Sequence, residues 1–489
     1  MLFNSIEFLL FFPFVVGMLF LLPFKYRWAF LLLASYFFYG LANGWFLLLI
    51  VLSTLIDYLV ALKMSKFEEK KDRKPYLYVS LFSNLGLLIL FKYFNFFISS
   101  FTDLFEVLHL EYAIPTLEII LPVGISFYTF QTLAYSIDVY RGNTKAESHF
   151  GVFALYVTYF PQLVAGPIER SQSLIPQLKK KTNLSYENVT GGLKLMAWGF
   201  FKKVVIADQI APLIQNVTNS PDEFYALSVL LCSVLFSYQI YCDFSGYSDI
   251  AIGAAQIMGV KLMVNFRRPF ASKSLGELWG RWHISLNNWF RDYLYVPLGG
   301  NRHGKFKLYR NVFIVFLISG LWHGASYNFI IWGMFHGIFV LIFSKSGISN
   351  LFHLKGFSLL KTTAQKVFTF LLFSVLFIFF YPKNIQQSIL LMSNLFSDWL
   401  PWFEAVRMNE ENMRSTLLYL GTDIFKPLII VFFIVILEVV QYYQGKHGSF
   451  REYWSRKPLF IRWFGYVQLV IIIVLFSFDN AVPFYYFKF

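Results

Sequence analysis

Residues 311–344 read NVFIVFLISGLWHGASYNFIIWGMFHGIFVLIFS, a run of 34 residues without Asp, Glu, Lys or Arg. A membrane-spanning helix needs about 20 apolar residues, so this run is long for one span and short for two. We expect a helix break at residues 324–328. His323 would then lie at a helix end, roughly 20 Å along the helix from Arg310. An ionisable side chain at that depth marks a candidate functional site, and imidazole can accept a proton near neutral pH.

The composition predicts a membrane protein throughout. The chain is 57% hydrophobic and 14% charged, whereas a soluble domain is about 25% charged. We therefore expect an all-α, polytopic transmembrane helical bundle that forms a single integral membrane domain over residues 1–489. Cys232 and Cys242 match no metal-binding spacing, so we predict packing roles for them and no metal site. The expected apolar segments are 5–23, 28–42, 45–62, 76–98, 119–137, 149–168, 191–212, 225–244, 311–344, 367–381, 425–443 and 463–482.

The net charge of +14 is concentrated in a few loops. The segment 261–310 carries ten Lys and Arg residues against only Glu277 and Asp292. Basic loops of a multispan protein usually lie on the cytoplasmic side, and we predict that placement here. Nucleic-acid binding is the poorer explanation of the charge, since no soluble module carries it.

The segment 149–168 is expected to enter the membrane and return, because basic loops flank it on both sides. It ends in FPQLVAGPIER (160–170), where Pro161, Gly166 and Pro167 interrupt a helix. Broken backbone at membrane depth survives only inside protein or along a cavity. An ordinary span with a kink is the alternative.

Apolar residues recur at helical spacing between Leu275 and Leu294, which predicts one amphipathic helix at the cytoplasmic interface. His283 and Asn287 lie four residues apart on one side of it, and a solvated polar face is the alternative. The following loop GGNRHGK (299–305) could cradle phosphate or be plain solvated loop. His336 matches no metal-binding pair, and a structural histidine bonded to a neighbouring helix is the simpler reading.

YCDFSGYSDIAIG (241–253) is expected to join the span 225–244 to the next segment. Asp243 and Asp249 lie near membrane depth, so we expect them to pair internally. Their spacing puts them about 240° apart on a helix, which excludes a carboxylate dyad on one face. No Ser/His/Asp set can be assembled around Ser245 from the sequence.

Four of these stretches together resemble the membrane-bound O-acyltransferase (MBOAT) family, in particular the bacterial alginate O-acetyltransferases. They are FPQLVAGPIER (160–170), DFSGYSDIAIG (243–253), WGRWHISLNNWFRDYLYVPLGGNR (279–302) and SGLWHGASYNFIIWGMFHG (319–337). The motif core thus covers about 160–337. The resemblance implies re-entrant and interfacial helices around a central catalytic tunnel. It also implies that His323 is the catalytic histidine and His283 the second characteristic polar position.

The implied function is acyl transfer from a cytoplasmic thioester, such as acetyl-CoA, across the bacterial inner membrane for O-acetylation of an extracellular polysaccharide such as alginate. Such chemistry needs a base for the hydroxyl proton and stabilisation of the oxyanion. No tightly bound cofactor is expected. The immediate acceptor would be a periplasmic partner acyltransferase or the polysaccharide itself. The expected donor-binding residues are Asn287, Arg267, Arg268, Arg302 and Lys305.

Three alternatives stay open at this point. The same mechanism could serve peptidoglycan acylation or teichoic-acid D-alanylation. A different class, a transporter or flippase of lipid-linked sugar, would use His323 for proton relay or substrate binding.

Overall fold

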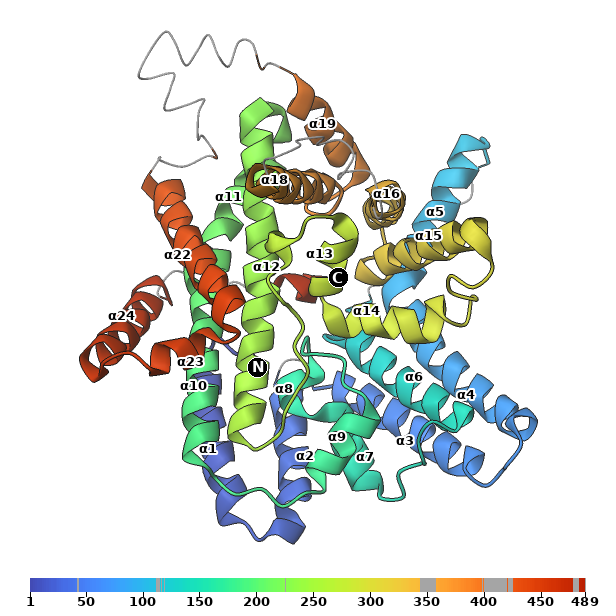
Figure 1. Cartoon of the computed structure of the whole chain (residues 1–489). Helices are drawn as coiled ribbons and strands as arrows, with labels where there is room; N and C mark the ends of the chain where they lie inside the picture. The colour runs from blue at the N-terminus through green and yellow to red at the C-terminus, as the bar shows by residue number, and fades with distance from the viewer. Residues whose placement is uncertain are drawn as a thin grey trace. The chain divides into compact units, whose positions relative to one another are not determined.

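Every regular element in the part of the chain that the structure describes is a helix (Figure 1). This computed structural model describes residues 1–41, 44–110, 119–224, 226–343, 358–397, 425–477 and 483–488, together with Pro115, Leu117, Trp399 and Leu420. The all-α prediction is confirmed for these residues. The described chain divides into two compact units, one of residues 1–196, 248–264 and 486–489 and one of residues 197–247 and 265–485. A single domain over the whole chain stays a prediction.

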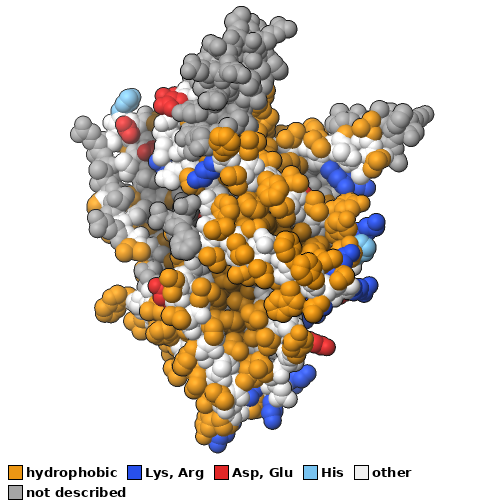
Figure 2. Space-filling view, turned by 90° about the vertical axis from the view of Figure 1, so that its left-hand side faces the viewer, with side chains coloured by type: hydrophobic (Ala, Val, Ile, Leu, Met, Phe, Trp, Pro, Cys, Tyr) orange, Lys and Arg blue, Asp and Glu red, His pale blue; other side chains and the backbone are white. Residues whose placement is uncertain are grey.

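Six helical stretches among the described residues are long and apolar enough to cross a membrane, which confirms a multi-pass membrane protein. Hydrophobic side chains also cover much of the face drawn in Figure 2. The helix Leu459–Ser477 is apolar, yet none of the residues in its most apolar part is buried within the protein. Lipid is therefore its natural surrounding. The other five stretches are Phe46–Met64, Lys70–Val107, Ala226–Ile257, Leu359–Phe379 and Phe425–His447, and two shorter apolar helices are Ile6–Leu21 and Tyr327–Phe343.

The first unit is built from helices of the N-terminal part of the chain. They are α1 (Ile6–Leu21), α2 (Phe24–Gly40), α3 (Phe46–Met64), α4 (Lys70–Leu88), the π-helix η1 (Ile89–Tyr93), α5 (Phe94–Val107), α6 (Ile125–Arg141), α7 (Phe150–Thr158), α8 (Phe160–Leu163), α9 (Ser171–Leu178) and most of α10 (Tyr186–Phe200). The end of α12 (Ala226–Ile257) completes it.

A fully buried carboxylate joins α3, α4 and α6 in this unit. Asp57 accepts hydrogen bonds from the Ser80 hydroxyl, from the Asn84 amide at 2.8 Å and from the Ser136 hydroxyl at 3.1 Å. Thr132 in turn donates to the Asn84 carbonyl oxygen at 2.9 Å. A buried charge is tolerated only when neighbouring donors satisfy it, so this network fixes how the three helices pack.

The segment 149–168 has the broken helical backbone that its prolines and glycines predict. α7 is nine residues long, and α8 follows after a break at Tyr159. Nine residues span about 14 Å, well short of a bilayer. Residues 151–169 are buried, so the break lies inside protein as the membrane requires. The side of the membrane to which this segment returns stays a prediction.

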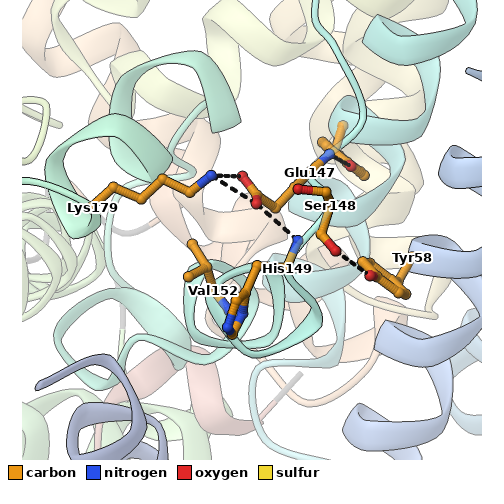
Figure 3. Close-up of polar contacts among 7 residues, drawn as sticks. Tyr58, Glu147, Ser148, His149, Val152 and Lys179 are labelled. Atoms are coloured by element: carbon orange, nitrogen blue, oxygen red, sulfur yellow. Dashed lines mark hydrogen bonds and ion pairs between the residues drawn. The ribbon is translucent and has the colours of Figure 1, made fainter. Parts of the chain in front are cut away.

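A polar cluster holds the start of α7 (Figure 3). The Lys179 ammonium contacts both carboxylate oxygens of Glu147, at 2.7 and 2.6 Å. The same carboxylate accepts the His149 N–H at 3.0 Å, and the Tyr58 hydroxyl donates to the Ser148 carbonyl at 2.6 Å. His149 then caps the helix, because its Nδ1 accepts the Val152 N–H at 3.2 Å.

The second unit holds the motif-rich half of the chain. Its elements are the π-helix η2 (Phe201–Ala207), α11 (Asp208–Asn219), η3 (Pro221–Glu223), most of α12, η4 (Pro269–Ala271), α13 (Leu275–Arg281), α14 (Ile284–Phe290), η5 (Arg291–Tyr295), α15 (Gly304–His323), α16 (Tyr327–Phe343), α18 (Ser358–Leu376), η6 (Phe377–Phe379), α19 (Ile385–Phe396), α22 (Phe425–His447), α23 (Phe450–Ser455) and α24 (Leu459–Ser477).

The prediction that residues 241–253 join two segments is wrong, since α12 runs unbroken through them to Ile257. Two contacts explain the continuity. Gly246 lies so close to the Gly199 carbonyl that a Cβ there would sit 2.8 Å from its oxygen. Asp243 forms an ion pair with Lys203 at 2.6 Å, as its depth predicted. Its charge is therefore satisfied without a break in the helix.

The expected break in the run 311–344 is confirmed: α15 ends at His323 and α16 begins at Tyr327. Glycines let the two helices approach closely. A Cβ on Gly320 would overlap the Phe329 carbonyl oxygen, and one on Gly333 would overlap the Phe316 carbonyl oxygen. Small residues allow such packing where no hydrophobic effect drives helices together. The glycine contacts therefore fix where His323 lies.

We predict that Gly320→Val destabilises the protein, because the valine side chain has no space beside Phe329. Overpacking of this kind typically costs about 1–3 kcal/mol. The measurement is the apparent melting temperature of detergent-purified protein. Gly276→Ala is the matched control, since nothing lies within 4 Å of a Cβ at that helical position. Equal melting temperatures for the two variants would contradict the packing described here.

Candidate active site

His323 occupies the last position of α15, immediately before an extended residue. Gly324 has φ −167° and ψ 152°, so the helix stops there. The Phe329 ring fills the space where a side chain on Gly324 would lie. Across the break, the Asn328 amide donates to the Pro382 carbonyl at 3.2 Å. Residues at the start of α16 thus hold the turn between α15 and α16.

Aromatic rings surround the His323 imidazole, which is only 3% exposed. Its ring centroid lies 5.0 Å from that of Trp322, 5.1 Å from that of Trp332 and 5.4 Å from that of Phe380, each edge to face. Edge-to-face packing fixes the plane of a ring. The surroundings also exclude bulk water, which strengthens any electrostatic interaction made by the imidazole.

His283 lies at a second break in the helical backbone. The prediction of one amphipathic helix over 275–294 is wrong, because α13 ends at Arg281 and α14 begins at Ile284. His283 between them has φ 43°, a left-handed conformation that is uncommon outside glycine. Such backbone costs about 1–3 kcal/mol and persists only where neighbours hold it.

Two asparagines, buried Asn265 and half-buried Asn287, supply that hold. Asn265 accepts the Ile284 N–H on its backbone carbonyl at 2.9 Å and the Ser285 N–H on its side-chain oxygen at 3.4 Å. The Asn287 amide donates to the carbonyls of Trp279 and Trp282, at 2.5 and 2.6 Å. Asn287 therefore satisfies the end of α13. Asn265 could not be predicted from the sequence, where its only signal is its position 18 residues before His283.

The two histidines share an aromatic neighbour. The His283 imidazole lies 5.9 Å from the Trp322 ring, and Trp322 also contacts His323. His283 also packs edge to face on Phe244, with 4.6 Å between ring centroids. The structure thus brings both predicted histidines to one indole, although 40 residues separate them in sequence. Burial lowers the pKa of His283 to about 3, so its imidazole is neutral at pH 7.

The cations expected to bind the donor differ in how far they are exposed to solvent. Arg267, Arg302 and Lys305 are exposed, whereas Arg268 is half-buried and its guanidinium packs on the backbone of Gly445. The loop of Arg302 is a defined turn, with positive φ at Gly299, Gly300 and Gly304. Buried Asn311 holds this turn, because its amide donates to the Leu298 and Gly300 carbonyls at 3.1 and 2.9 Å. This role of Asn311 was not predicted from the sequence.

His336 contributes to the aromatic packing around His323. It is fully buried, with its ring 4.7 Å from that of Trp332 and 5.2 Å from that of Trp279. The expected hydrogen bond to a neighbouring helix is not found among the described residues. Trp332 lies between this ring and His323, so His336 packs behind a wall of the candidate site.

We expect acid to destabilise the wild-type protein partly through His283. A histidine in the unfolded chain titrates near pH 6.5, but the buried one stays neutral to about pH 3. Below pH 6.5 the unfolded state therefore binds a proton that the folded state does not. At pH 5 this costs about 2 kcal/mol of the free energy of unfolding.

The check is thermal unfolding of wild type and His283→Asn at pH 7 and pH 5. The melting temperature should fall less in the variant, which lacks the titrating group. An equal fall in both proteins would refute the assignment of acid sensitivity to this residue.

Comparison with known proteins identifies the family of the chain. The family model for MBOAT, the membrane-bound O-acyltransferase family, matches residues 148–382, which include both histidines. The chain is 37% identical over 441 residues to the probable alginate O-acetylase AlgI of Pseudomonas aeruginosa, covering 88% of this chain and 81% of the relative.

Two relatives with other acceptors in their names are also similar. The peptidoglycan O-acetyltransferase of Helicobacter pylori is 37% identical over 392 residues, with 75% of this chain and 73% of the relative covered. The teichoic acid D-alanyltransferase of Bacillus subtilis is 29% identical over 234 residues, with 45% and 58% covered. The chain therefore belongs to the membrane-bound O-acyltransferase family and is a multi-pass membrane O-acyltransferase.

Proposed function

We propose that this chain moves acetyl groups from a cytoplasmic thioester, such as acetyl-CoA, across the bacterial inner membrane for O-acetylation of an extracellular polysaccharide such as alginate. The observation that carries the proposal is the buried imidazole of His323 at a helix break, enclosed by Trp322, Trp332 and Phe380. An ionisable group in such surroundings is retained where it has a chemical task.

That task is to accept the proton of the acceptor hydroxyl. As His323 takes the proton, the hydroxyl oxygen attacks the thioester carbonyl carbon and an oxyanion forms. The carbon–sulfur bond then breaks, the acyl ester is released, and the thiolate recovers the proton from the imidazolium. The aromatic walls favour acyl transfer over hydrolysis, because they exclude the water that would otherwise attack the thioester.

His283 has a supporting role in this scheme. Its imidazole is neutral, so it can donate or accept a hydrogen bond but adds no charge to the site. Its backbone conformation is held by Asn265 and Asn287. We assign to it the orientation of the thioester or of His323. Asn287 then acts through His283 rather than by contact with the donor.

The donor is proposed to enter beside the exposed cations of the second unit. Arg267, Arg302 and Lys305 present charge to solvent, which suits the phosphates of a nucleotide thioester. The guanidinium of half-buried Arg268 packs on the backbone of Gly445, so its side chain also holds the loop to α22. Lipids of the inner membrane surround the apolar helices, and the donor is a substrate rather than a bound cofactor.

The acceptor is the part of the proposal that rests most on relatives. The alginate O-acetylase and the peptidoglycan O-acetyltransferase have the same level of identity to this chain, and both names describe acetyl transfer. Their shared chemistry favours acetyl over D-alanyl, since the teichoic acid relative covers less than half of the chain. Peptidoglycan stays the second candidate acceptor.

The immediate acceptor is proposed to be a periplasmic partner acyltransferase. The transferase relatives leave the transporter alternative without support.

We predict that His323→Ala loses roughly a hundredfold or more of the acetyl-transfer rate, the usual contribution of a general base. His283→Asn keeps a hydrogen-bonding side chain and should lose only about tenfold, the cost of one weakened hydrogen bond. Thiol release from acetyl-CoA by membrane vesicles gives the rate. Both variants must reach wild-type levels in the membrane. Wild-type activity of His323→Ala would remove the base assignment, and a fully inactive His283→Asn would give His283 a direct role in proton transfer.

Substitution of the exposed cations tests donor entry. Arg267→Ala and Arg302→Ala should raise KM for acetyl-CoA and leave kcat near the wild-type value, because phosphate contacts persist unchanged through the reaction. Arg451→Ala is a matched control, since Arg451 is also exposed but lies on α23, outside the basic segment. If KM stays unchanged in both variants while the control behaves like wild type, the donor enters elsewhere.

A further inference from the structure

Residues 483–485 return to the second unit more than two hundred residues after the motif that they touch. The Tyr485 N–H donates to the Asp243 carboxylate at 2.7 Å across a separation of 242 residues. Phe484 is buried, with an exposed fraction of 2%. A backbone hydrogen bond to a carboxylate is stronger than one to a neutral acceptor. This short segment is therefore held at a defined place.

The anchor for the segment is a buried group of charges. The second Asp243 oxygen pairs with the Lys203 ammonium at 2.6 Å, and Lys203 also pairs with Asp208 at 2.7 Å. All three side chains are almost fully buried. Removing one partner of a buried pair is strongly unfavourable, so Asp243 has little freedom to move. One Asp243 carboxylate oxygen contacts the Lys203 ammonium, and the other accepts the Tyr485 N–H.

From this anchor, aromatic contacts lead to each histidine. Phe484 lies 5.6 Å from Phe244, ring centroid to ring centroid, and Phe244 packs on His283. Tyr485 lies 6.4 Å from Phe380, and Phe380 packs on His323. Two adjacent residues thus support one wall of each imidazole. The segment thus contacts a neighbour of each histidine through a different ring, which a role in filling space alone does not require.

We propose that Phe484 and Tyr485 are positioning residues of the acyl-transfer site, anchored by Asp243 and Lys203. They set the rings of Phe244 and Phe380, and through these rings they set the planes of the two imidazoles. This gives a role to Asp243 of the DFSGYS motif and to a part of the chain in which the sequence shows no motif. The inference rests on the proposed function for its kinetic readout, but its geometric readout is independent of the reaction.

Tyr485→Ala and Phe484→Ala test the proposal. Each should lower kcat for acetyl transfer roughly tenfold to a hundredfold, with KM for acetyl-CoA within about twofold, because misplacement of a catalytic group by a fraction of an ångström affects the chemical step. Tyr485→Phe keeps the ring and the backbone N–H and should restore at least half of kcat. Tyr442→Ala is the control, since Tyr442 is 62% exposed on α22.

The second readout is the rate at which diethyl pyrocarbonate modifies His323 and His283 in purified protein, followed by mass spectrometry. Loss of a supporting ring should raise the modification rate of His323 in Tyr485→Ala and of His283 in Phe484→Ala, each several-fold over wild type and Tyr442→Ala. This holds whatever reaction the protein catalyses, so a failed acetylation assay does not decide it. Tyr485→Leu and Phe484→Leu, which keep apolar volume, replace any alanine variant that aggregates.

Three results would overturn the proposal. Wild-type kcat with wild-type histidine reactivity in the Ala or Leu variants would show that the segment only fills space. A Tyr485→Phe variant as inactive as Tyr485→Ala would assign the effect to the hydroxyl rather than to the ring. Equal acceleration of His323 and His283 modification in every variant, Tyr442→Ala included, would indicate general loosening of the protein.

Discussion

Inside a membrane, a break in a helix leaves backbone groups that lipid cannot satisfy, so the protein or water in a cavity must bond to them. The two histidines of the candidate site lie at two such breaks, His283 between α13 and α14 and His323 between α15 and α16. Side-chain amides of Asn265, Asn287 and Asn328 bond the backbone around them. A break held in this way gives the buried side chain at a helix end a fixed position while its main chain stays rigid. The remaining features of the site depend on this constraint.

Buried carboxylates are satisfied by different partners in the two units. Asp57 is satisfied by hydroxyl and amide donors, whereas Asp243 and Asp208 share the ammonium of Lys203. In the second unit this pairing lies one residue from Phe244, which packs on His283. The buried ion pairs of Lys203 are therefore directly next to the aromatic residues that surround His283. Rigid surroundings of this kind favour catalysis, because orientation of the reacting groups need not be recovered in each turnover.

The sequence predicted the helical class, the break after His323 and the internal pairing of Asp243, because hydropathy and polar residues at membrane depth are strong signals. It failed at 275–294, where a regular apolar spacing conceals the left-handed backbone of His283. It failed again at 241–253, where small and polar residues suggested a loop between two segments, but α12 continues through them. In both places the outcome depends on partners far away in sequence, Asn265 and Lys203. Periodicity contains no information about such partners.

The central claim is that the imidazole of His323 receives the proton of the acceptor hydroxyl at the thioester carbonyl. A structure of the protein with an acetyl-CoA analogue whose sulfur is replaced by methylene tests it most directly. The account predicts that the carbonyl carbon lies beside the His323 imidazole, with room for a hydroxyl oxygen about 3 Å from both. A carbonyl bound out of reach of His323, or held next to His283 instead, would contradict it.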